Sequence, residues 1–221
     1  MIRQRLAFSF ALATTFLQAS IGLADDSPLY ARRTDIIYGR KFGTALTMDV
    51  FTPKAQPNGL GIVHVVSGGW YSSHDLDGVI PALVPFLRRG YTVFAVVHGS
   101  QPKFTIPEIL EDMHRAVRFI RFHAGEYGID PMQIGITGSS AGGHLSLMQG
   151  TAGKDGDPNA RDPVDRVSSK VQAVACFYPP TDFLNYGKPG EVAAGRGTLW
   201  KFAAPFDFRE YDPSKAKYIT I

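Results

Sequence analysis

Between residues 61 and 178 the sequence alternates short apolar runs with stretches of helical spacing. The apolar runs are nearly continuous and rich in β-branched residues, which is typical of strands that are covered on both faces. Strands that alternate with helices favour a mostly parallel sheet with helices on both faces, because right-handed crossovers carry each helix over the sheet. The predicted fold class is therefore α/β. The strands expected in this region are residues 61–66, 91–97, 133–137 and 171–178.

An antiparallel hairpin is expected ahead of this region, because residues 34–38 and 47–51 have strand character around the turn-prone Arg40-Lys41-Phe42-Gly43. Three helices are expected further along. The second of them begins with Pro107, carries acids in its first turn and ends with Arg118 and Arg121, the order that the helix dipole prefers. The helices predicted are residues 80–89, residues 107–124 and a segment from the turn at 138–143 to about residue 150.

The composition indicates one globular domain and limits its function. The chain has 221 residues, of which 44% are hydrophobic and 19% charged. Two of the charges behind its formal +3 are Arg3 and Arg5, so the rest carries +1, and a nucleic-acid footprint is not supported. The single cysteine, Cys176, excludes a disulfide framework and a cysteine-rich zinc site. Residues 151–170 and 181–200, rich in Gly, Pro and Asp, are expected to be loops that could shape a pocket.

The first 24 residues are predicted to be a signal peptide. Arg3 and Arg5 precede the apolar stretch 6–17, and small residues suit cleavage after Ala24. The apolar stretch is shorter than the roughly 20 residues that span a bilayer, so an uncleaved anchor is the weaker alternative. We therefore expect a mature domain over residues 25–221, secreted or periplasmic, without membrane contact after cleavage.

The run Gly138-Ser139-Ser140-Ala141-Gly142 matches the pattern G-x-S-x-G between an expected strand and an expected helix. A nucleophile on a tight strand-to-helix turn needs flanking residues without bulky side chains. Such a turn exposes the Ser140 hydroxyl and aims the amino end of the helix at a developing oxyanion. Ser140 is therefore the candidate nucleophile, and the alternative is a small-residue turn used only for packing.

With these residues the chain resembles the α/β-hydrolase superfamily, specifically the exported carboxylesterase and acetyl-xylan or feruloyl esterase-like branch. The resemblance covers most of the chain from about Thr34 onward. It implies hydrolysis of small-molecule or carbohydrate-linked carboxylic esters by Ser140, with no metal or organic cofactor. The segments that carry it are Gly138-Ser139-Ser140-Ala141-Gly142-Gly143-His144-Leu145, Ser67-Gly68-Gly69-Trp70 and Asp112-Met113-His114-Arg115-Ala116-Val117-Arg118-Phe119.

The resemblance also implies an oxyanion hole, although the sequence departs from the family pattern there. The family usually carries His-Gly-Gly-Gly after its third strand, and Val66 and Ser67 replace the His and the first Gly here. Because the hole is built from backbone N–H groups, Gly68 or Gly69 can still supply one donor, and Ala141 the second. A plain turn is the alternative for this segment.

The catalytic acid and histidine of such a hydrolase follow the nucleophile in the chain. The only histidine after Ser140 is His144, which shares its helix and is expected to pack. Asp182 follows the last expected strand, but its surroundings suit a turn or a helix cap. The resemblance implies eight strands and only six are expected. We therefore expect an N-terminal part of a longer esterase that has little turnover by itself, with a non-catalytic domain as the alternative.

The positions of the remaining histidines in the sequence indicate their expected roles. His98 follows an expected parallel strand and His74 lies in the loop after Trp70, so both are candidates to line the pocket near Ser140 or to contact the substrate, as is Trp70. Substitution of His98 or His74 for the missing base is the weaker alternative. The other histidines, His64, His114 and His123, are expected to be structural.

Two further functions compete with the esterase. A prolyl-oligopeptidase-like peptidase has the same fold and a similar serine turn, but the Ser-Ala-Gly-Gly-His run favours the esterase branch. An exported binding domain without a working triad would also fit the missing histidine.

Overall fold

The computed structural model describes residues 27–194 and 196–220. The predicted signal peptide, residues 1–24, and its cleavage site lie outside the described residues. Among the described residues, no helix is long and apolar enough to cross a membrane.

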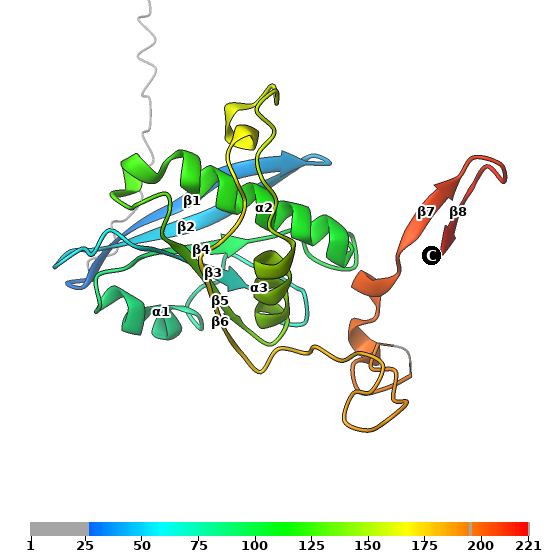
Figure 1. The fold of residues 1–221 in the computed structure, drawn as a ribbon. Coiled ribbons are helices and arrows are strands. Elements are labelled where there is room, and N and C mark those ends of the chain that lie inside the picture. The colour runs from blue at the N-terminus through cyan, green and yellow to red at the C-terminus, as the bar shows by residue number, and fades with distance from the viewer. Residues whose placement is uncertain (1–26, 195, 221) are drawn as a thin grey trace, which may run out of the picture.

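A six-stranded sheet organises the fold, with strand order β1-β2-β4-β3-β5-β6 (Figure 1). The first two strands are antiparallel to each other, and β2 is antiparallel to β4. The strands β4, β3, β5 and β6 are mutually parallel, which confirms the predicted α/β class. The strands are β1 (Tyr30–Lys41), β2 (Thr44–Pro53), β3 (Gly61–Val66), β4 (Thr92–Val97), β5 (Ile134–Ser139) and β6 (Ala173–Phe177).

The β1–β2 hairpin occurs where the sequence predicts it, but its strands are longer than expected. The two turn residues, Phe42 and Gly43, have φ of 45° and 75°. Positive φ at both central positions gives the turn a twist that matches paired strands. An irregularity between Arg33 and Ile36, with Asp35 at φ 56°, lets β1 continue past a break in its alternation.

Helices cover both faces of the sheet (Figure 1). Alternate residues of β4 separate two cores: Phe94 and Val96 pack with α2 and α3, whereas Val93 and Ala95 pack with α1. A reciprocal capping box between Thr105 and Glu108 fixes the start of α2. The helices are α1 (Ile80–Leu87), α2 (Ile106–Phe122) and α3 (Ala141–Ala152), close to the predicted bounds.

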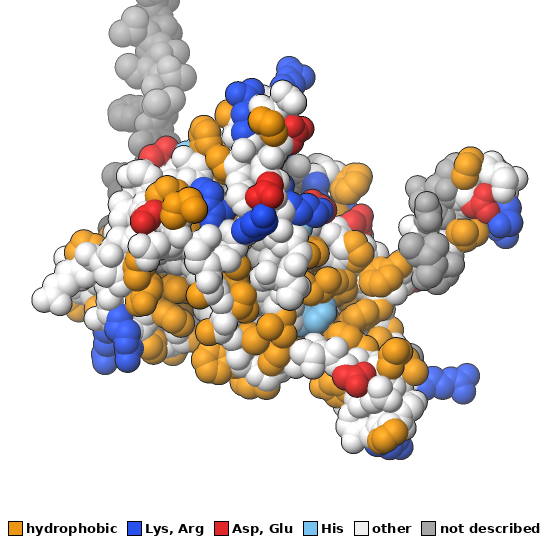
Figure 2. All heavy atoms as spheres, viewed as in Figure 1, with side chains coloured by type: hydrophobic (Ala, Val, Ile, Leu, Met, Phe, Trp, Pro, Cys, Tyr) orange, Lys and Arg blue, Asp and Glu red, His pale blue; other side chains and the backbone are white. Residues whose placement is uncertain are grey.

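The chain beyond β6 leaves the sheet. It forms short 3-10 turns and a separate two-stranded hairpin, none of which was expected from the sequence (Figure 1). The edge strand β6 is exposed, with Val174 and Phe177 at 38% and 57%, and Tyr178 directly after it is 76% exposed. Hydrophobic side chains are prominent across this part of the surface in Figure 2. The elements named here are η3 (Trp200–Phe202), η4 (Ala204–Phe206), β7 (Arg209–Asp212) and β8 (Lys217–Thr220).

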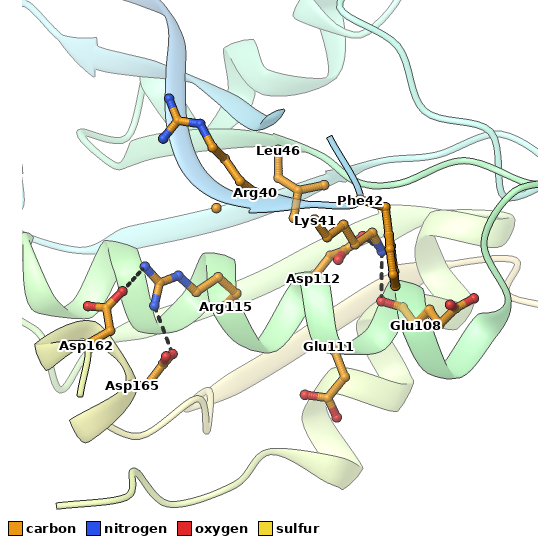
Figure 3. A pocket seen from close by; sticks show the side chains of 11 residues that line it. Arg40, Lys41, Phe42, Leu46, Glu108, Glu111, Asp112, Arg115, Asp162 and Asp165 are labelled. Carbon is orange, nitrogen blue, oxygen red and sulfur yellow. Dashed lines mark hydrogen bonds and ion pairs between the residues drawn. The ribbon is translucent and has the colours of Figure 1, made fainter. Parts of the chain in front are cut away.

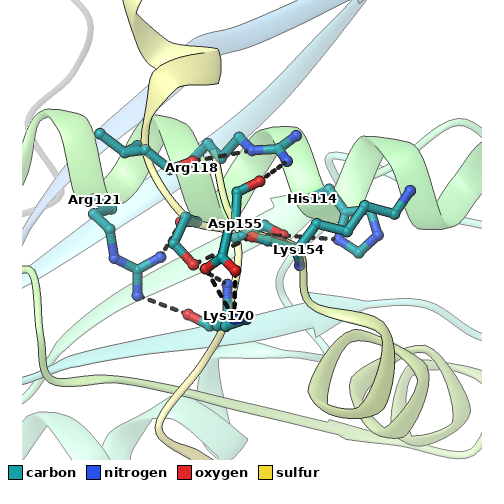
Figure 4. A network of polar contacts seen from close by, with 9 residues as sticks. His114, Arg118, Arg121, Lys154, Asp155 and Lys170 are labelled. Atoms are coloured by element: carbon teal, nitrogen blue, oxygen red, sulfur yellow. Dashed lines mark hydrogen bonds and ion pairs between the residues drawn. The ribbon is translucent and has the colours of Figure 1, made fainter. Parts of the chain in front are cut away.

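The segment between α3 and β6 is held by an arginine of α2 (Figure 4). The Arg121 guanidinium donates to the carbonyl oxygens of Pro131, Ser168 and Lys170. This group is 8% exposed, so the bonds replace water that the guanidinium would otherwise bind. Arg121 therefore fixes the entry of the chain into β6.

Replacing Arg121 by methionine is expected to lower the free energy of unfolding by about 2 kcal/mol, because three partly buried carbonyls lose their charged donor. Denaturant unfolding measures the loss. Arg88, which is exposed at the end of α1, provides the matched control, and Arg88→Met is expected to change stability by less than about 0.5 kcal/mol. Equal effects of the two substitutions would contradict this role of Arg121.

Candidate active site

Ser140 lies at a sharp turn between β5 and α3. The strand ends at Ser139 and the helix begins at Ala141. Ser140 has φ 52° and ψ −123°, a conformation that costs a non-glycine residue of order 1–3 kcal/mol and persists only where its surroundings impose it. The Ser140 side chain is exposed, and its hydroxyl makes no hydrogen bond to another described residue. The turn thus presents an unpaired hydroxyl to solvent.

Two glycines allow this turn to form. A Cβ on Gly138 would lie 2.6 Å from the backbone carbon and oxygen of Gly142. A Cβ on Gly142 would lie 2.7 Å from the carbonyl oxygen of Val65, at the end of β3. Both glycines are therefore required by close backbone approach, and the second brings the start of α3 against the end of β3.

Backbone hydrogen bonds anchor Ser140 on both sides. Its N–H donates to the carbonyl oxygen of Phe177 in β6 at 3.0 Å, and its carbonyl oxygen accepts from the N–H of His144 at 3.0 Å. The N–H of Ala141, at the first position of α3, has no partner among the described residues. Because the amino end of a helix also carries partial positive charge, this N–H is suited to hold an oxyanion.

The segment after β3 forms a tight turn that offers a second donor. Gly68 donates its N–H to the carbonyl oxygen of Tyr71 at 2.9 Å and accepts from the Tyr71 N–H at 3.0 Å. The central residues, Gly69 and Trp70, have φ of 55° and 61°. The Gly68 N–H is thus engaged, whereas the Gly69 N–H has no partner within the described chain. Of the two glycines considered as oxyanion donors, the geometry favours Gly69.

Trp70 lies elsewhere than expected. We expected it to border the pocket, but its side chain is 1% exposed and packs in an aromatic cluster. Its ring centroid lies 4.9 Å from that of Phe206 and 6.1 Å from that of Phe183, which belongs to the loop 181–200. The Nε1–H of Trp70 donates to Nδ1 of His144 at 3.3 Å. His144 is accordingly a packing residue, as the sequence suggested.

His74 and His98, the two histidines expected at the pocket, lie together in a cavity of about 380 Å³ that neither Ser139 nor Ser140 lines. His98 is 3% exposed and its Nδ1 is 2.8 Å from the carbonyl oxygen of Gly99. Nδ1 of His74 lies 3.3 Å from Oγ1 of Thr47. Neither side chain hydrogen-bonds Ser140.

Of the three histidines assigned to structural roles, His64 borders the cavity beside the serine turn that Ser139 also lines, whereas His114 and His123 lie in other parts of the fold. His64 lies on β3, and burial lowers its pKa to about 4. His114 is fully buried, with its Nδ1 3.3 Å from Oγ of Ser169. Nδ1 of His123 lies 2.9 Å from the carbonyl oxygen of Phe119. All six histidines of the chain are described, and none contacts the Ser140 hydroxyl.

Lowering the pH from 6.5 to 5 is expected to destabilise the protein. Burial lowers the pKa of His64, His98 and His144 from 6.5 to about 4, so in this range the unfolded chain binds protons that the native protein does not. The loss is about 1.5 kcal/mol for each histidine. Urea unfolding at several pH values measures it. His64→Gln should reduce the pH dependence by about a third, and a flat profile in the unmodified protein would contradict the burial account.

Two further cavities differ in their position relative to the serine turn. One of about 420 Å³ lies beside the serine turn and is lined by Ser139 and by residues of the 67–73 loop. The other, of about 550 Å³, lies between the hairpin and α2 (Figure 3). Several of its charges pair with each other, Lys41 with Asp112 at 2.6 Å and Arg115 with Asp162 at 2.7 Å. The loop 151–170 therefore lines a cavity on α2 instead of one at Ser140.

Asp182 serves its own loop. Its carboxylate accepts from the N–H groups of Leu184 and Asn185, at 3.0 and 2.9 Å. These hydrogen bonds, together with the amide of Asn185, lower the pKa of Asp182. The turn assignment made from the sequence is the one that the contacts support.

A mostly parallel sheet whose strand β5 is followed by an exposed serine at positive φ, directly before a helix, defines an α/β-hydrolase fold. The chain belongs to the BD-FAE family, whose sequence profile matches residues 48–199.

Known proteins with sequence or structural similarity include esterases and ester hydrolases. The probable carboxylic ester hydrolase LipM of Mycobacterium tuberculosis is 32% identical over 157 residues, which are 70% of this chain and 36% of LipM. The acetyl ester-xyloside bifunctional hydrolase of Caldicellulosiruptor lactoaceticus superposes with a TM-score of 0.61 at 22% identity, covering 77% of this chain and 68% of that one. A carbohydrate esterase from gut microbiota gives 0.63 at 23% identity, covering 76% and 64%. The chain thus spans about a third of the length of LipM.

Proposed function

We propose that this chain carries the nucleophile and the oxyanion hole of a serine esterase. The observation that carries the proposal is the exposed Ser140 at φ 52°, next to the unpaired N–H of Ala141 and near the turn that holds the unpaired N–H of Gly69. An imposed backbone conformation at an exposed, unpaired hydroxyl is hard to explain by packing. It is the arrangement that acyl transfer requires.

The reaction follows from these groups. A general base takes the Ser140 proton while Oγ attacks the ester carbonyl carbon, and the carbonyl oxygen becomes an oxyanion held by the N–H groups of Gly69 and Ala141. The carbon–oxygen bond to the alcohol then breaks, and the alcohol leaves with the proton from the base. Water attacks the acyl-enzyme with the same assistance, which releases the carboxylic acid and returns the proton to Ser140. One ester and one water give one acid and one alcohol.

We also propose that the general base is none of the six histidines of this chain. Nδ1 of His144 accepts from Trp70, and His74 and His98 line another cavity. His64 lines the cavity beside the serine turn, but its buried Nδ1 makes no hydrogen bond to Ser140. The base and its acid partner then join the site from a part of the native protein outside these 221 residues. Residues 25–221 alone are therefore expected to hydrolyse a short-chain ester only at a low residual rate, because a site without its base retains only the contribution of binding and the oxyanion hole.

The substrate class proposed is a small acyl ester of an alcohol or a sugar. Support comes from LipM, described as a carboxylic ester hydrolase, and from the two structural neighbours, described as an acetyl ester-xyloside hydrolase and a carbohydrate esterase. A cavity of about 420 Å³ adjoins the serine turn and is large enough for such a group, although it is lined by Ser139 and not by Ser140 itself.

The proposed function can be tested by assaying the native protein with three substrates: a short-chain p-nitrophenyl ester, acetylated xylan, and a proline p-nitroanilide as the peptidase substrate. Release of nitrophenol or acetate, together with no release of nitroaniline, is the expected result. Preferential cleavage of the proline amide would replace the esterase with a peptidase. No turnover of any substrate and no acylation of Ser140 would replace it with a non-catalytic binding domain.

A further inference from the structure

The turn that offers the Gly69 N–H is held in a conformation that its sequence does not favour. Trp70 occupies the left-handed region at φ 61°, which costs an ordinary L-residue about 1–2 kcal/mol. A tryptophan at this place therefore needs contacts that compensate for the cost. The direction of the Gly69 N–H depends on whether those contacts hold.

Side-chain contacts hold the turn from two directions. On the backbone side, Gln101 donates from Nε2 to the Gly69 carbonyl oxygen at 2.5 Å and from its N–H to the Trp70 carbonyl oxygen at 3.2 Å. On the other side, the Trp70 ring enters the interior, where its Nε1–H donates to Nδ1 of His144 at 3.3 Å. The two rings meet edge to face, with centroids 5.7 Å apart and an angle of 83° between their planes.

His144 is fixed relative to the nucleophile. It lies one helical turn after Ser140 on α3, and its N–H donates to the Ser140 carbonyl oxygen at 3.0 Å. Its side chain is 9% exposed, and burial lowers its pKa to about 4, so the ring is neutral near pH 7. A neutral ring that accepts at Nδ1 carries its proton at Nε2. The hydrogen-bond acceptor for Trp70 is thus built into the helix that begins at the nucleophile.

We propose that Trp70 and His144 form a positioning pair, whose hydrogen bond ties the turn bearing the Gly69 donor to the helix bearing Ser140 and the Ala141 donor. The proposal rests on the proposed function, since it assigns to the pair the alignment of that oxyanion hole. Neither side chain touches the substrate. The surrounding aromatic rings of Phe183 and Phe206 pack against the pair, whereas the hydrogen bond from Nε1 to Nδ1 fixes the orientation of the turn relative to α3.

Three single variants of the native protein separate the effect of the Trp70–His144 hydrogen bond from the effect of aromatic packing. Trp70→Phe keeps a ring but removes the donor, His144→Leu removes the acceptor, and His144→Asn keeps an acceptor near the position of Nδ1. The first two are expected to lower kcat for a short-chain ester about tenfold, with KM changed by less than about twofold, because the lost alignment acts on the transition state. His144→Asn should recover most of kcat. His123→Leu, at the far end of α2, is the matched control and should leave both constants unchanged.

The double variant Trp70→Phe/His144→Leu decides whether the two residues act through one bond. If they do, its kcat equals that of the weaker single variant, because the bond can be lost only once. Additive losses, no recovery in His144→Asn, or a change in KM with kcat unchanged would each overturn the pair.

Amide hydrogen exchange makes the pair testable apart from the chemistry. In Trp70→Phe and His144→Leu, the hydrogen-bonded amides of the turn, those of Gly68 and Tyr71, should exchange at least about tenfold faster, whereas His144→Asn and His123→Leu should match the unmodified protein. If the unmodified protein neither hydrolyses esters nor is acylated, the proposed function fails, and the exchange data still show whether the pair holds the turn. Unchanged exchange in both Trp70→Phe and His144→Leu would refute the proposal that the hydrogen bond holds the turn.

Discussion

Ser140→Ala is expected to abolish ester hydrolysis by the native protein, with a loss of about 10⁶-fold in kcat, as when the nucleophile of a comparable serine hydrolase is removed. The substitution removes one oxygen from an exposed side chain and leaves the backbone hydrogen bonds of Ser140 to Phe177 and His144 available. Stability should therefore change little. Rapid acid quenching with a short acyl ester, followed by intact mass measurement, should show an acyl adduct on the unmodified protein and none on the variant.

Ser139 provides the matched control for this prediction, because it is the neighbouring hydroxyl and lines the cavity beside the turn. Ser139→Ala should retain the acyl adduct. An adduct that persists in Ser140→Ala and disappears in Ser139→Ala would transfer the nucleophile to Ser139.

Gly138→Ala is expected to disrupt the serine turn itself. The added Cβ would lie 2.6 Å from the backbone carbon and oxygen of Gly142 and 3.1 Å from the N of Gly143. Backbone atoms cannot move aside as a flexible side chain can, so the start of α3 must shift away from β5. We expect a loss of about 3 kcal/mol in the free energy of unfolding and about 100-fold in kcat/KM.

Gly125→Ala makes the same chemical change in open space, because a Cβ there would meet nothing within 4 Å. It should change the free energy of unfolding by less than about 0.5 kcal/mol and leave kcat/KM unaltered. Comparison of the two variants by denaturant unfolding and ester hydrolysis isolates the contact at the turn. A Gly138→Ala protein as stable and active as Gly125→Ala would mean that the turn tolerates a side chain there.

The sheet and its helices could be predicted from the sequence because their signals are local. Continuous apolar runs such as residues 61–66 mark strands that are buried on both faces, and Pro107 with its following acids marks the start of α2. The hairpin of β7 and β8 had no such signal, because its strands are four residues each and lie outside the sheet. The length of β1 was underestimated because Asp35, at φ 56°, interrupts its alternation.

The site was predictable only in part. The G-x-S-x-G spacing identified Ser140 as the candidate nucleophile. The choice between Gly68 and Gly69 as the oxyanion donor depended on a hydrogen bond to Tyr71 that no sequence pattern predicts. The burial of Trp70 was missed for a similar reason, because its partner His144 lies 74 residues away in the sequence. Such partners are set by the packing of β3 against α3 and become visible only in three dimensions.

Phosphylation by an organophosphate tests the central claim most directly, since the reagent reacts with an activated serine and forms a stable covalent bond. The native protein would be treated with paraoxon, digested and mapped by mass spectrometry. The account predicts a single diethylphosphoryl group on Ser140, formed more slowly in the variants that loosen the Gly69 turn. Modification at another residue, or none under conditions in which a short-chain ester is hydrolysed, would contradict Ser140 as the nucleophile.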